Sequence, residues 1–391
     1  MVVLQGTSLC NLNCSYCYLS EAGRKAGARM ELCQIELTAR RIFSSPFLGR
    51  RLRISWHSGE PMTLGVDYYR EAIATILAQR DEILGPAFPV DFDIQTNGTL
   101  IDEQWCKFIL EMNGMLLVGV SCDGPAELHD RYRRNWSGRP SHEKTEAGMR
   151  LLASHGIDFD ITAVLSQQSL SEPEKFLDYF SQFTPHIREF HYNLLDELFF
   201  ADSSDPAVDA YVALYRNFLE RLLAHLERAP RGSLPPLRNL SGFYNRLFVP
   251  PEDRPAYDAR AMSKPFKTLS IETNGDVTTF YAGLTIDECR DLVDIYGDGK
   301  GFAIGNIYEM DLAQIAAGEK LAHIRRDFET SHAACEARCE YYDLCSGGYN
   351  LIKYRRFSAF DVTETPECRV HVKTFADNML SHMNNEKGVV A

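Results

Sequence analysis

The sequence lacks the features of a secreted or membrane-spanning protein. Within its 391 residues, no apolar stretch approaches the ~20 residues that a helix needs to cross a bilayer. The N-terminal sequence MVVLQGTSLCN has no basic region followed by an apolar run and a small-residue cleavage site, so it does not predict a secretory signal. No internal repeat or low-complexity tract is present. With 45% hydrophobic and 24% charged residues, the chain is expected to be a globular cytoplasmic protein.

The chain also has fewer positively than negatively charged side chains. Lys and Arg number 41 against 54 Asp and Glu, which gives a formal net charge of −13. An acidic chain is repelled by phosphate backbones and by anionic lipid surfaces. We therefore predict that neither nucleic acid nor membrane is a partner. A basic or neutral peptide partner remains compatible with this charge, although the sign alone does not identify one.

Cysteine, by contrast, is plentiful, with 11 residues. Without a secretion signal, this number favours a reducing cytosol and metal or cluster chemistry over disulfides. Cys10, Cys14 and Cys17 share one short turn with the spacing C-x3-C-x2-C. An iron–sulfur cube needs four ligands, so three thiolates would leave one iron open to bind something else. A zinc knuckle or incidental buried thiols are the alternatives for this loop taken alone.

The first two hundred residues alternate short apolar runs with segments of helical periodicity. The expected strands are Met1–Gln5, Arg51–Trp56, Val90–Gln95, Met115–Ser121, Asp158–Leu165 and Arg188–Leu194. The expected helices between them include Ile35–Phe43, Tyr68–Ile83, Gln104–Met112 and His142–His155. This alternation predicts parallel βαβ units with right-handed crossovers.

Polar residues gather just past the ends of these strands. They are the cysteine loop, Ser58–Pro61, Gln95–Gly98, Ser121–Gly124 and Asn193–Glu197. In α/β barrels, the loops at the carboxyl ends of the strands build the site. We therefore expect these five segments to lie on one face.

The second half of the chain predicts a separate unit. After a helix at Asp209–Glu227, the sequence from Ala229 to Pro265 is proline-rich and irregular, which indicates a long, partly ordered connection. This connection is either a plain surface linker or a cover for the site. Asn274-Gly275 within Thr268–Tyr281 predicts a hairpin, and a helix is expected near Asp311–Arg326. The expected domains are 1–228, 229–265 as the connection, and 266–391.

Four further cysteines form a second group. Cys335, Cys339, Cys345 and Cys368 have the spacing C-x3-C-x5-C-x22-C. Four thiolates close either a structural zinc site or a [4Fe–4S] cluster. Spacing alone favours iron–sulfur only slightly.

The chain resembles the radical S-adenosylmethionine (radical SAM) enzymes in two motifs. In that family, the three-cysteine loop holds a [4Fe–4S] cluster whose open iron is chelated by the amino and carboxylate groups of S-adenosylmethionine. Ser58-Gly59-Glu60-Pro61 resembles the second signature, Gly-Gly-Glu-Pro, which hydrogen-bonds the cofactor's ammonium. Ser58 replaces the first glycine, and its small side chain is expected to leave the turn intact. The resemblance implies a partial (β/α)6 TIM-type barrel.

The same resemblance implies further cofactor contacts. Ser121 fits the position that contacts the ribose, and Arg133 resembles an arginine that holds the cofactor carboxylate through paired hydrogen bonds. The alternative for Arg133 is a surface basic cluster with Arg131 and Arg134. Polar side chains on the third loop, Gln95, Thr96 and Asn97, would line the cofactor pocket. His57 favours a structural, hydrogen-bonded role over proton relay.

With a radical SAM motif upstream, the second cysteine group resembles a SPASM or twitch domain. This favours one auxiliary [4Fe–4S] cluster over zinc. The chain departs from the two-cluster pattern, because Phe280, Tyr281 and Tyr349 occupy positions where such domains carry cysteines. Cys289 is a candidate spare ligand. Cys33, Cys106 and Cys122 are expected to be small core residues.

Several stretches, among them WHSGEP, CEYYDLCSGGYNLIK and ETPECR, are similar to maturases of ribosomally made peptides, especially the cyclophane-forming branch. The resemblance implies a 5′-deoxyadenosyl radical that abstracts a side-chain hydrogen from a precursor peptide, and a reducing donor such as flavodoxin or ferredoxin. Asp196, Glu197 and Asp343 are candidate bases, because a substrate radical that loses an electron must also lose a proton. The alternatives are a sulfatase-maturing enzyme that makes formylglycine and a non-catalytic iron–sulfur electron carrier.

Overall fold

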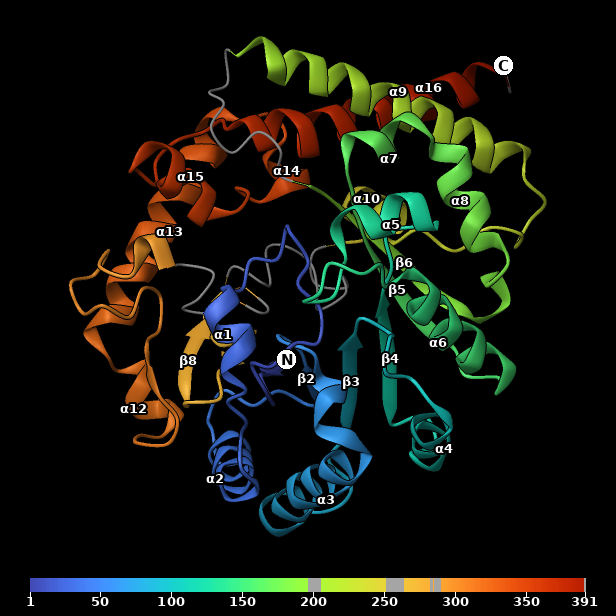
Figure 1. Cartoon of the computed structure of the whole chain (residues 1–391). Helices are drawn as coiled ribbons and strands as arrows, with labels where there is room; N and C mark the ends of the chain where they lie inside the picture. The colour runs from blue at the N-terminus through green and yellow to red at the C-terminus, as the bar shows by residue number, and fades with distance from the viewer. Residues whose placement is uncertain (196–204, 251–263, 282–283, 285–289, 390–391) are drawn as a thin grey trace. The chain divides into compact units, whose positions relative to one another are not determined.

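The computed structural model describes residues 1–195, 205–250, 264–281, 284 and 290–389 (Figure 1). Its strands are β1 (Val2–Leu4), β2 (Leu52–Trp56), β3 (Val90–Thr96), β4 (Leu116–Ser121), β5 (Phe159–Leu165), β6 (Ile187–Leu194), β7 (Leu269–Ile271), β8 (Asp276–Thr279) and β9 (Gly305–Asn306).

Helices account for most of the remaining structure. The first half contains α1 (Glu21–Ala26), α2 (Leu32–Phe43), α3 (Gly65–Ile83), α4 (Glu103–Glu111), α5 (Ala126–Tyr132), α6 (His142–Ser154), α7 (Gln167–Ser171) and α8 (Pro173–Ser181). The second half contains α9 (Pro206–Arg228), α10 (Arg238–Phe248), α12 (Leu312–Ala316), α13 (Glu319–Arg338), α14 (Tyr342–Cys345), α15 (Asn350–Phe357) and α16 (Phe375–Val389). Shorter turns are η1 (Pro61–Leu64), η2 (Thr184–His186), η4 (Arg290–Leu292) and the π-helical η5 (Cys368–Thr374).

The six predicted barrel strands are confirmed and alternate with helices as expected. The described residues form a nine-stranded sheet in the order β6-β5-β4-β3-β2-β1-β7-β8-β9. Strands β1 to β4 pair in parallel, and one row across them joins Val2 to Ile54, Ile54 to Phe92, and Phe92 to Leu116. The α/β fold with a parallel sheet follows from short apolar strands that are each returned by a helix.

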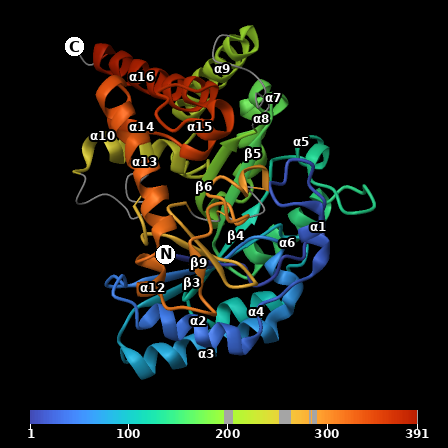
Figure 2. The same ribbon diagram turned by 90° about the vertical axis from the view of Figure 1, so that its left-hand side faces the viewer.

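Alternation along each strand decides which side chains enter the core. In β3, Val90, Phe92, Ile94 and Thr96 are buried, while the residues between them are half-exposed. Helices α2, α3 and α4 run side by side along one side of these strands (Figures 1 and 2). Between helices and sheet lies an aromatic core in which Trp56, Tyr69 and Trp105 follow one another, with ring centroids 5.2 and 5.6 Å apart.

The predicted hairpin is confirmed, and it extends the same sheet. β7 pairs in parallel with β1 through Val3 and Ser270, and antiparallel with β8 through Ser270 and Thr278. At the turn Gly275 has a φ of +88°, and a Cβ there would lie 2.5 Å from the Tyr308 ring. Only glycine fits such a turn without moving its neighbours.

Two compact units make up the chain. The first comprises Met1–Cys122, His129–Ile161 and Ala261–Arg325, and the second Asp123–Leu128, Thr162–Arg260 and Arg326–Ala391. The limits of these units differ from the predicted domain limits at 228 and 265, and β7 of the second half pairs with β1 in the first unit. The domain division of the sequence analysis therefore stays a prediction.

The second unit has a helical core of its own. Leu223 of α9, Phe243 of α10, and Ala376 and Met379 of α16 form one buried cluster. Phe243 meets Phe375 edge to face at 5.7 Å. Helix α10 lies inside the proline-rich segment from Ala229 to Pro265 and forms an ordered part of the predicted connection.

The helix expected at Asp311–Arg326 is interrupted. Helix α12 ends at Ala316, and the amide of Gly318 donates to the carbonyl of Ile315 at 3.1 Å before α13 begins.

Within the described residues, every helix is too short or too polar to span a bilayer.

Candidate functional site

The three N-terminal cysteines lie on an irregular loop that follows β1. The amide of Cys10 donates to the carbonyl of Arg24 at 3.0 Å, and the amide of Ser15 donates to the carbonyl of Tyr132 at 3.0 Å. The indole of Trp136 donates to the carbonyl of Cys10 at 2.8 Å. The loop is therefore held in shape by backbone bonds to segments on both sides of it.

The thiols of this loop interact electrostatically. Burial raises the pKa of Cys10 to about 12, and Glu60 and the thiols of Cys14 and Cys17 add to the rise. Iron binding requires thiolates, so a cluster would displace these protons. Three soft sulfur donors on one loop fit an iron–sulfur cluster. As the side chains stand, no group of three or more His, Cys, Asp or Glu in the described residues could hold a metal ion, so the ligand assignment stays a prediction.

Glu60 is the best-connected acid of the site and is only 1% exposed. Its Oε1 accepts from the amide of Met62 at 3.0 Å and from the hydroxyl of Thr96 at 2.7 Å. Its Oε2 accepts from the amide of Asn97 at 2.7 Å. Burial raises the pKa of Glu60, and these three hydrogen bonds oppose the rise. The carboxylate is thus fixed in place by the chain itself and keeps one oxygen with a single partner.

The turn before Glu60 needs its glycine. Gly59 has a φ of +72°, and a Cβ there would lie 2.5 Å from the carbonyl oxygen of Thr7 and 2.8 Å from that of Leu9. The amide of Glu60 donates to the carbonyl of Leu9 at 2.7 Å. Ser58 also has a positive φ, 74°, so the turn keeps the left-handed backbone even where serine replaces glycine. This close approach binds the second signature to the cysteine loop.

The third loop is joined to the cysteine loop by a residue that the sequence analysis missed. The side-chain Nδ2 of Asn97 donates to Oδ1 of Asn11 at 2.7 Å, and Nδ2 of Asn11 donates to the hydroxyl of Thr99 at 2.8 Å. A polar side chain directly after the first ligand candidate was the available signal. Thr145 fixes the loop from α6 by donating to the carbonyl of Asn97 at 2.9 Å.

Gln95 and Ser121 meet across β3 and β4. The side-chain amide of Gln95 donates to the hydroxyl of Ser121 at 2.9 Å. Gly119, on the neighbouring strand, makes room, because a Cβ there would lie 2.3 Å from the Gln95 side-chain oxygen. The structure thus brings these two predicted cofactor residues together at the carboxyl ends of adjacent strands.

Arg133 lies beside the cysteine loop. It is only 7% exposed, and its guanidinium sits 5.3 Å from the ring centroid of Tyr16, which is between Cys14 and Cys17. Arg131 and Arg134 are exposed, as the alternative of a surface basic cluster requires, but Arg133 is buried and does not belong to such a cluster. A stacked, buried guanidinium is rigid enough to orient a carboxylate.

His57 is held neutral. Burial lowers its pKa to about 4, and its Nε2 lies 3.2 Å from the hydroxyl of Tyr18. A neutral ring in a fixed hydrogen bond agrees with the structural role that the sequence favoured.

The second cysteine group comes from three elements of the second unit. Cys335 is buried on α13, Cys345 ends α14, and Cys368 begins η5. Burial raises the pKa of Cys345 to about 11, and the thiols of Cys368 and Cys335 add to the rise. Cys339 follows one turn after Cys335, with its amide donating to the Cys335 carbonyl at 2.8 Å. Four thiols are the number that one closed cluster needs, and their assignment as its ligands stays a prediction, as it does for the N-terminal cysteines.

The turn between Cys345 and α15 takes a left-handed path. Ser346, Gly347 and Gly348 all have a positive φ, of 60°, 96° and 72°. Tyr349, which stands where SPASM domains carry a cysteine, is the N-cap residue of α15.

The remaining cysteines divide into two kinds. Cys106 and Cys122 are fully buried, as predicted. Cys33 is exposed near the start of α2, so its assignment to the core is wrong. The helix presents that position to solvent, while Ile35 and Ala39 face the core. Cys289 lies outside the described residues.

Of the three candidate bases, Asp343 alone lies in the part of the chain that the structure describes. Asp196 and Glu197 lie outside the described residues. Asp343 is exposed in the first turn of α14. All three stay predictions.

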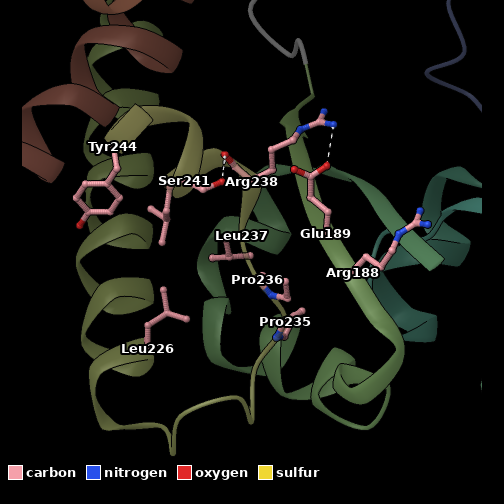
Figure 3. A pocket seen from close by; sticks show the side chains of 10 residues that line it. Arg188, Glu189, Leu226, Pro235, Pro236, Leu237, Arg238, Ser241 and Tyr244 are labelled. Carbon is pink, nitrogen blue, oxygen red and sulfur yellow. Dashed lines mark hydrogen bonds and ion pairs between the residues drawn. The ribbon is translucent and has the colours of Figure 1, made fainter. Parts of the chain in front are cut away.

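A cavity of about 460 Å³ lies elsewhere in the second unit (Figure 3). Glu189 of β6 and Arg238 of α10 approach each other at 3.4 Å at its rim. Its lining consists of Arg188, Glu189, Leu226, Pro235, Pro236, Leu237, Arg238, Leu240, Ser241 and Tyr244. No predicted site residue lines it.

Comparison with known proteins identifies relatives of the chain. The model of the radical SAM superfamily matches residues 4–180. An uncharacterized protein of Synechocystis sp. is 30% identical over 392 residues, which cover 100% of this chain and 93% of that protein. The serine-type anaerobic sulfatase-maturating enzyme of Bacteroides thetaiotaomicron is 34% identical over 188 residues, 47% of this chain and 43% of that enzyme.

Two solved structures share the fold. Native anSMEcpe with bound AdoMet and Cp18Cys peptide matches with a TM-score of 0.76 at 20% identity, covering 100% of this chain and 99% of that one. Streptococcus suis SuiB bound to precursor peptide SuiA matches with a TM-score of 0.59 at 17% identity, covering 92% and 73%. At these identities the likeness shows a common architecture.

The matched superfamily region contains the cysteine loop, the Glu60 turn and Arg133, which the structure holds together in one compact unit. The uncharacterized Synechocystis protein matches the whole length of the chain. The chain therefore belongs to the radical SAM superfamily, and it is an enzyme that uses a [4Fe–4S] cluster and S-adenosylmethionine.

Proposed function

We propose that the protein is a peptide maturase, which abstracts a side-chain hydrogen from a ribosomally made precursor peptide and forms a carbon–carbon, cyclophane-type crosslink. The observation that carries the peptide substrate is the full-length likeness in fold to anSMEcpe, whose structure holds AdoMet and a peptide. The similarity of CEYYDLCSGGYNLIK and ETPECR to cyclophane-forming maturases supports the type of bond.

The first unit would hold the cofactor through residues that are already fixed in place. Cys10, Cys14 and Cys17 would ligate the cluster. The free acceptor position of Glu60 would receive the ammonium of S-adenosylmethionine, and Arg133 would take its carboxylate. The turn of Ser58, Gly59 and Pro61 shapes this end of the pocket, and Gln95, Asn97 and Ser121 would contact the remainder of the cofactor.

When bound, the reduced cluster and S-adenosylmethionine supply the 5′-deoxyadenosyl radical that abstracts hydrogen. The contribution of the chain is orientation and the exclusion of water, because a radical reacts with whichever C–H bond lies nearest. The rigid links from Asn11 to Asn97 and from Gln95 to Ser121 serve this purpose. A reducing donor such as flavodoxin or ferredoxin would supply the electron.

Cys335, Cys339, Cys345 and Cys368 would close the coordination of one auxiliary [4Fe–4S] cluster. A closed cluster has no open iron for substrate, which leaves an electron-accepting or a structural role. Asp196, Glu197 and Asp343 remain the candidates for a base near the peptide.

A sulfatase-maturating activity is the second candidate. It is favoured by the 34% identity to the Bacteroides enzyme over 188 residues, 47% of this chain. The four C-terminal cysteines are too few for the two auxiliary clusters that this branch normally carries, which favours the crosslinking activity.

Mass spectrometry separates the two activities. The protein is co-expressed with a small peptide encoded beside its gene, and the recovered peptide is fragmented. A crosslink removes two hydrogens per site, blocks fragmentation between the joined residues and leaves no aldehyde. A formylglycine made from serine also removes two hydrogens, but a hydrazide probe captures its aldehyde.

The matched control is the Cys10→Ala/Cys14→Ala/Cys17→Ala variant, which should leave the peptide unmodified. A captured aldehyde would overturn the crosslinking proposal in favour of formylglycine formation. Modification by the triple variant would overturn both.

A further inference from the structure

Lys353 of α15 is buried in the second unit, with 1% of its surface exposed. Lysine almost never buries its ammonium without a partner of opposite charge, because removing a charge from water is costly. The position therefore requires a compensating group close to Nζ.

The partners of this ammonium come from α13, which lies beside α15 (Figure 1). Nζ of Lys353 donates to Oγ of Ser331 at 2.8 Å and to the sulfur of Cys335 at 3.0 Å. The carbonyl of Ser331 lies 3.4 Å away. Ser331 and Cys335 are four residues apart, so one face of α13 presents both groups to the lysine.

A further layer fixes Ser331. Its hydroxyl donates to Oδ1 of Asn350 at 2.8 Å, and both residues are fully buried. The amide of Asn350 in turn lies 3.4 Å from Nε2 of His332. This network holds the ammonium against the sulfur without supplying a negative charge.

No carboxylate pairs with Lys353 in the part of the chain that the structure describes. Nearby His332 is not a counter-charge, because an imidazole ring is either neutral or positively charged. The remaining candidate is sulfur, and the sulfur of Cys335 is in direct contact with the ammonium. A thiolate ligand would neutralise the ammonium where a thiol does not.

We propose that Lys353 is a positioning residue for the auxiliary cluster: its ammonium donates a hydrogen bond to the ligand sulfur of Cys335 and raises the reduction potential of the cluster. This inference rests on the proposed cluster at the four C-terminal cysteines. Reduction adds one negative charge to the cluster, and a buried cation beside a ligand sulfur stabilises that charge. Removing the cation should therefore shift the potential to a more negative value.

The test uses the full chain with Cys10→Ala, Cys14→Ala and Cys17→Ala, so that iron binds at the C-terminal group alone. Reduction is followed by electron paramagnetic resonance at set potentials, with iron content measured on each sample. Lys353→Met removes charge and donor at similar volume, and Lys353→Gln keeps a donor without charge. Both should shift the potential downward, Lys353→Met further.

Lys373→Met is the matched control. Lys373 also interacts electrostatically with Cys339 and Cys368, but its charge is neutralised by an ion pair with Glu364. Its removal should shift the potential less than the removal of Lys353.

A second measurement keeps Lys353 in place and so does not depend on the folding of a Lys353 variant. Lysine labelled with the heavy nitrogen isotope should give a nitrogen coupling in pulsed spectra of the reduced cluster in the Cys10→Ala/Cys14→Ala/Cys17→Ala chain. Iron-loaded chains with no such coupling, or with Lys353 variants of unchanged potential, would overturn the role of Lys353 while leaving the cluster in place. A chain that takes up no iron at the C-terminal group would overturn the cluster itself, and the inference with it.

Discussion

At the scale of single residues, the site depends on polar groups that are buried and already paired. Glu60 accepts three hydrogen bonds from its own chain while only 1% exposed. Such a group is pre-organised, because it does not have to find its geometry when the cofactor arrives. It is also sensitive to substitution, since each partner would be left unsatisfied in the interior.

Glu60→Gln should weaken S-adenosylmethionine binding without removing the N-terminal cluster. A charge-assisted hydrogen bond contributes roughly 1.5–3 kcal/mol, which corresponds to a loss of roughly ten- to a hundredfold in affinity. The measurement is a cofactor titration followed by the spectroscopic signal of the cluster.

Because the amide that replaces the carboxylate would turn its own N–H groups toward the donors of Thr96 or Asn97, the thermal stability of the variant has to be measured beside its affinity. Glu71→Gln, on the exposed face of α3, is the control and should bind normally. Unchanged affinity in Glu60→Gln would contradict the role of this carboxylate.

Three histidines with lowered pKa values should make the folded protein less stable in acid. Burial lowers the pKa of His57, His191 and His371 to about 4, below the ordinary value of 6.5. These groups stay neutral in the folded chain and take up protons in the unfolded one. Their contribution to stability is therefore present at neutral pH and is lost as the pH falls from about 6.5 to about 4.

Urea unfolding of the metal-free chain between these pH values measures the effect. His371→Gln should reduce the dependence of the unfolding free energy on pH by roughly one proton per molecule, because one of the three groups no longer titrates. An identical slope in the variant would show that His371 does not stay neutral in the fold.

At the scale of secondary structure, the turn after β2 shows how close packing joins two motifs. The backbone at Gly59 approaches Thr7 and Leu9 so closely that no side chain fits between them. The element therefore fixes the distance between the cysteine loop and the carboxylate of Glu60.

Gly59→Ala should cost the protein its N-terminal cluster. Its Cβ would lie 2.5 Å from a carbonyl oxygen, so the strain exceeds the roughly 1–2 kcal/mol of a left-handed alanine. Gly27→Ala is the control for the backbone strain alone, because Gly27 has a left-handed backbone (φ 69°, ψ 22°) with nothing within 4 Å of the added Cβ.

Iron content and melting temperature of the two variants provide the comparison. Gly27→Ala should keep its iron and melt only slightly lower. Equal iron in both variants would mean that the close contact at Gly59 does not control the site.

At the scale of the whole molecule, the seven candidate ligands fall into separate compact units. Cys10, Cys14 and Cys17 belong to the first unit, and the four C-terminal cysteines to the second. The two groups can therefore be emptied independently, which makes their roles separable by experiment.

The reconstituted protein should bind about eight irons per chain if both groups hold a [4Fe–4S] cluster. Alanine at Cys10, Cys14 and Cys17 should remove about half of this iron and abolish cofactor cleavage. Metal analysis after anaerobic reconstitution gives the iron content, and chromatography of 5′-deoxyadenosine gives the cleavage. Zinc at the C-terminal group, or about twelve irons, would contradict the count.

Loss of the C-terminal cluster should affect the peptide more than the cofactor. A Cys345→Ala/Cys368→Ala variant should still release 5′-deoxyadenosine, since the cofactor residues all lie in the first unit. It should yield little crosslinked peptide, and chromatography of both products measures the difference. Full crosslinking by a folded variant would exclude any role of that cluster in turnover, while loss of folding would indicate a structural role.

The sequence by itself determined the features that depend on near neighbours. The six barrel strands and most helices follow from the period of the apolar residues, because each element buries one face. The hairpin at Asn274-Gly275 follows from turn chemistry. The cysteine spacing and the turn at Ser58–Pro61 were recognisable because their function requires particular residue types within a few positions of one another.

Tertiary structure alone decided which distant residues meet and which side chains are covered. The pairing of β7 with β1, the bond from Asn97 to Asn11 and the contact of Lys353 with Cys335 join residues whose separation leaves no local pattern. Helix α10 lies in a proline-rich segment because Phe243 finds a partner in Phe375, and Cys33 is exposed because α2 turns that position to solvent. Burial depends on what packs against a residue, and that is fixed only when the whole chain has folded.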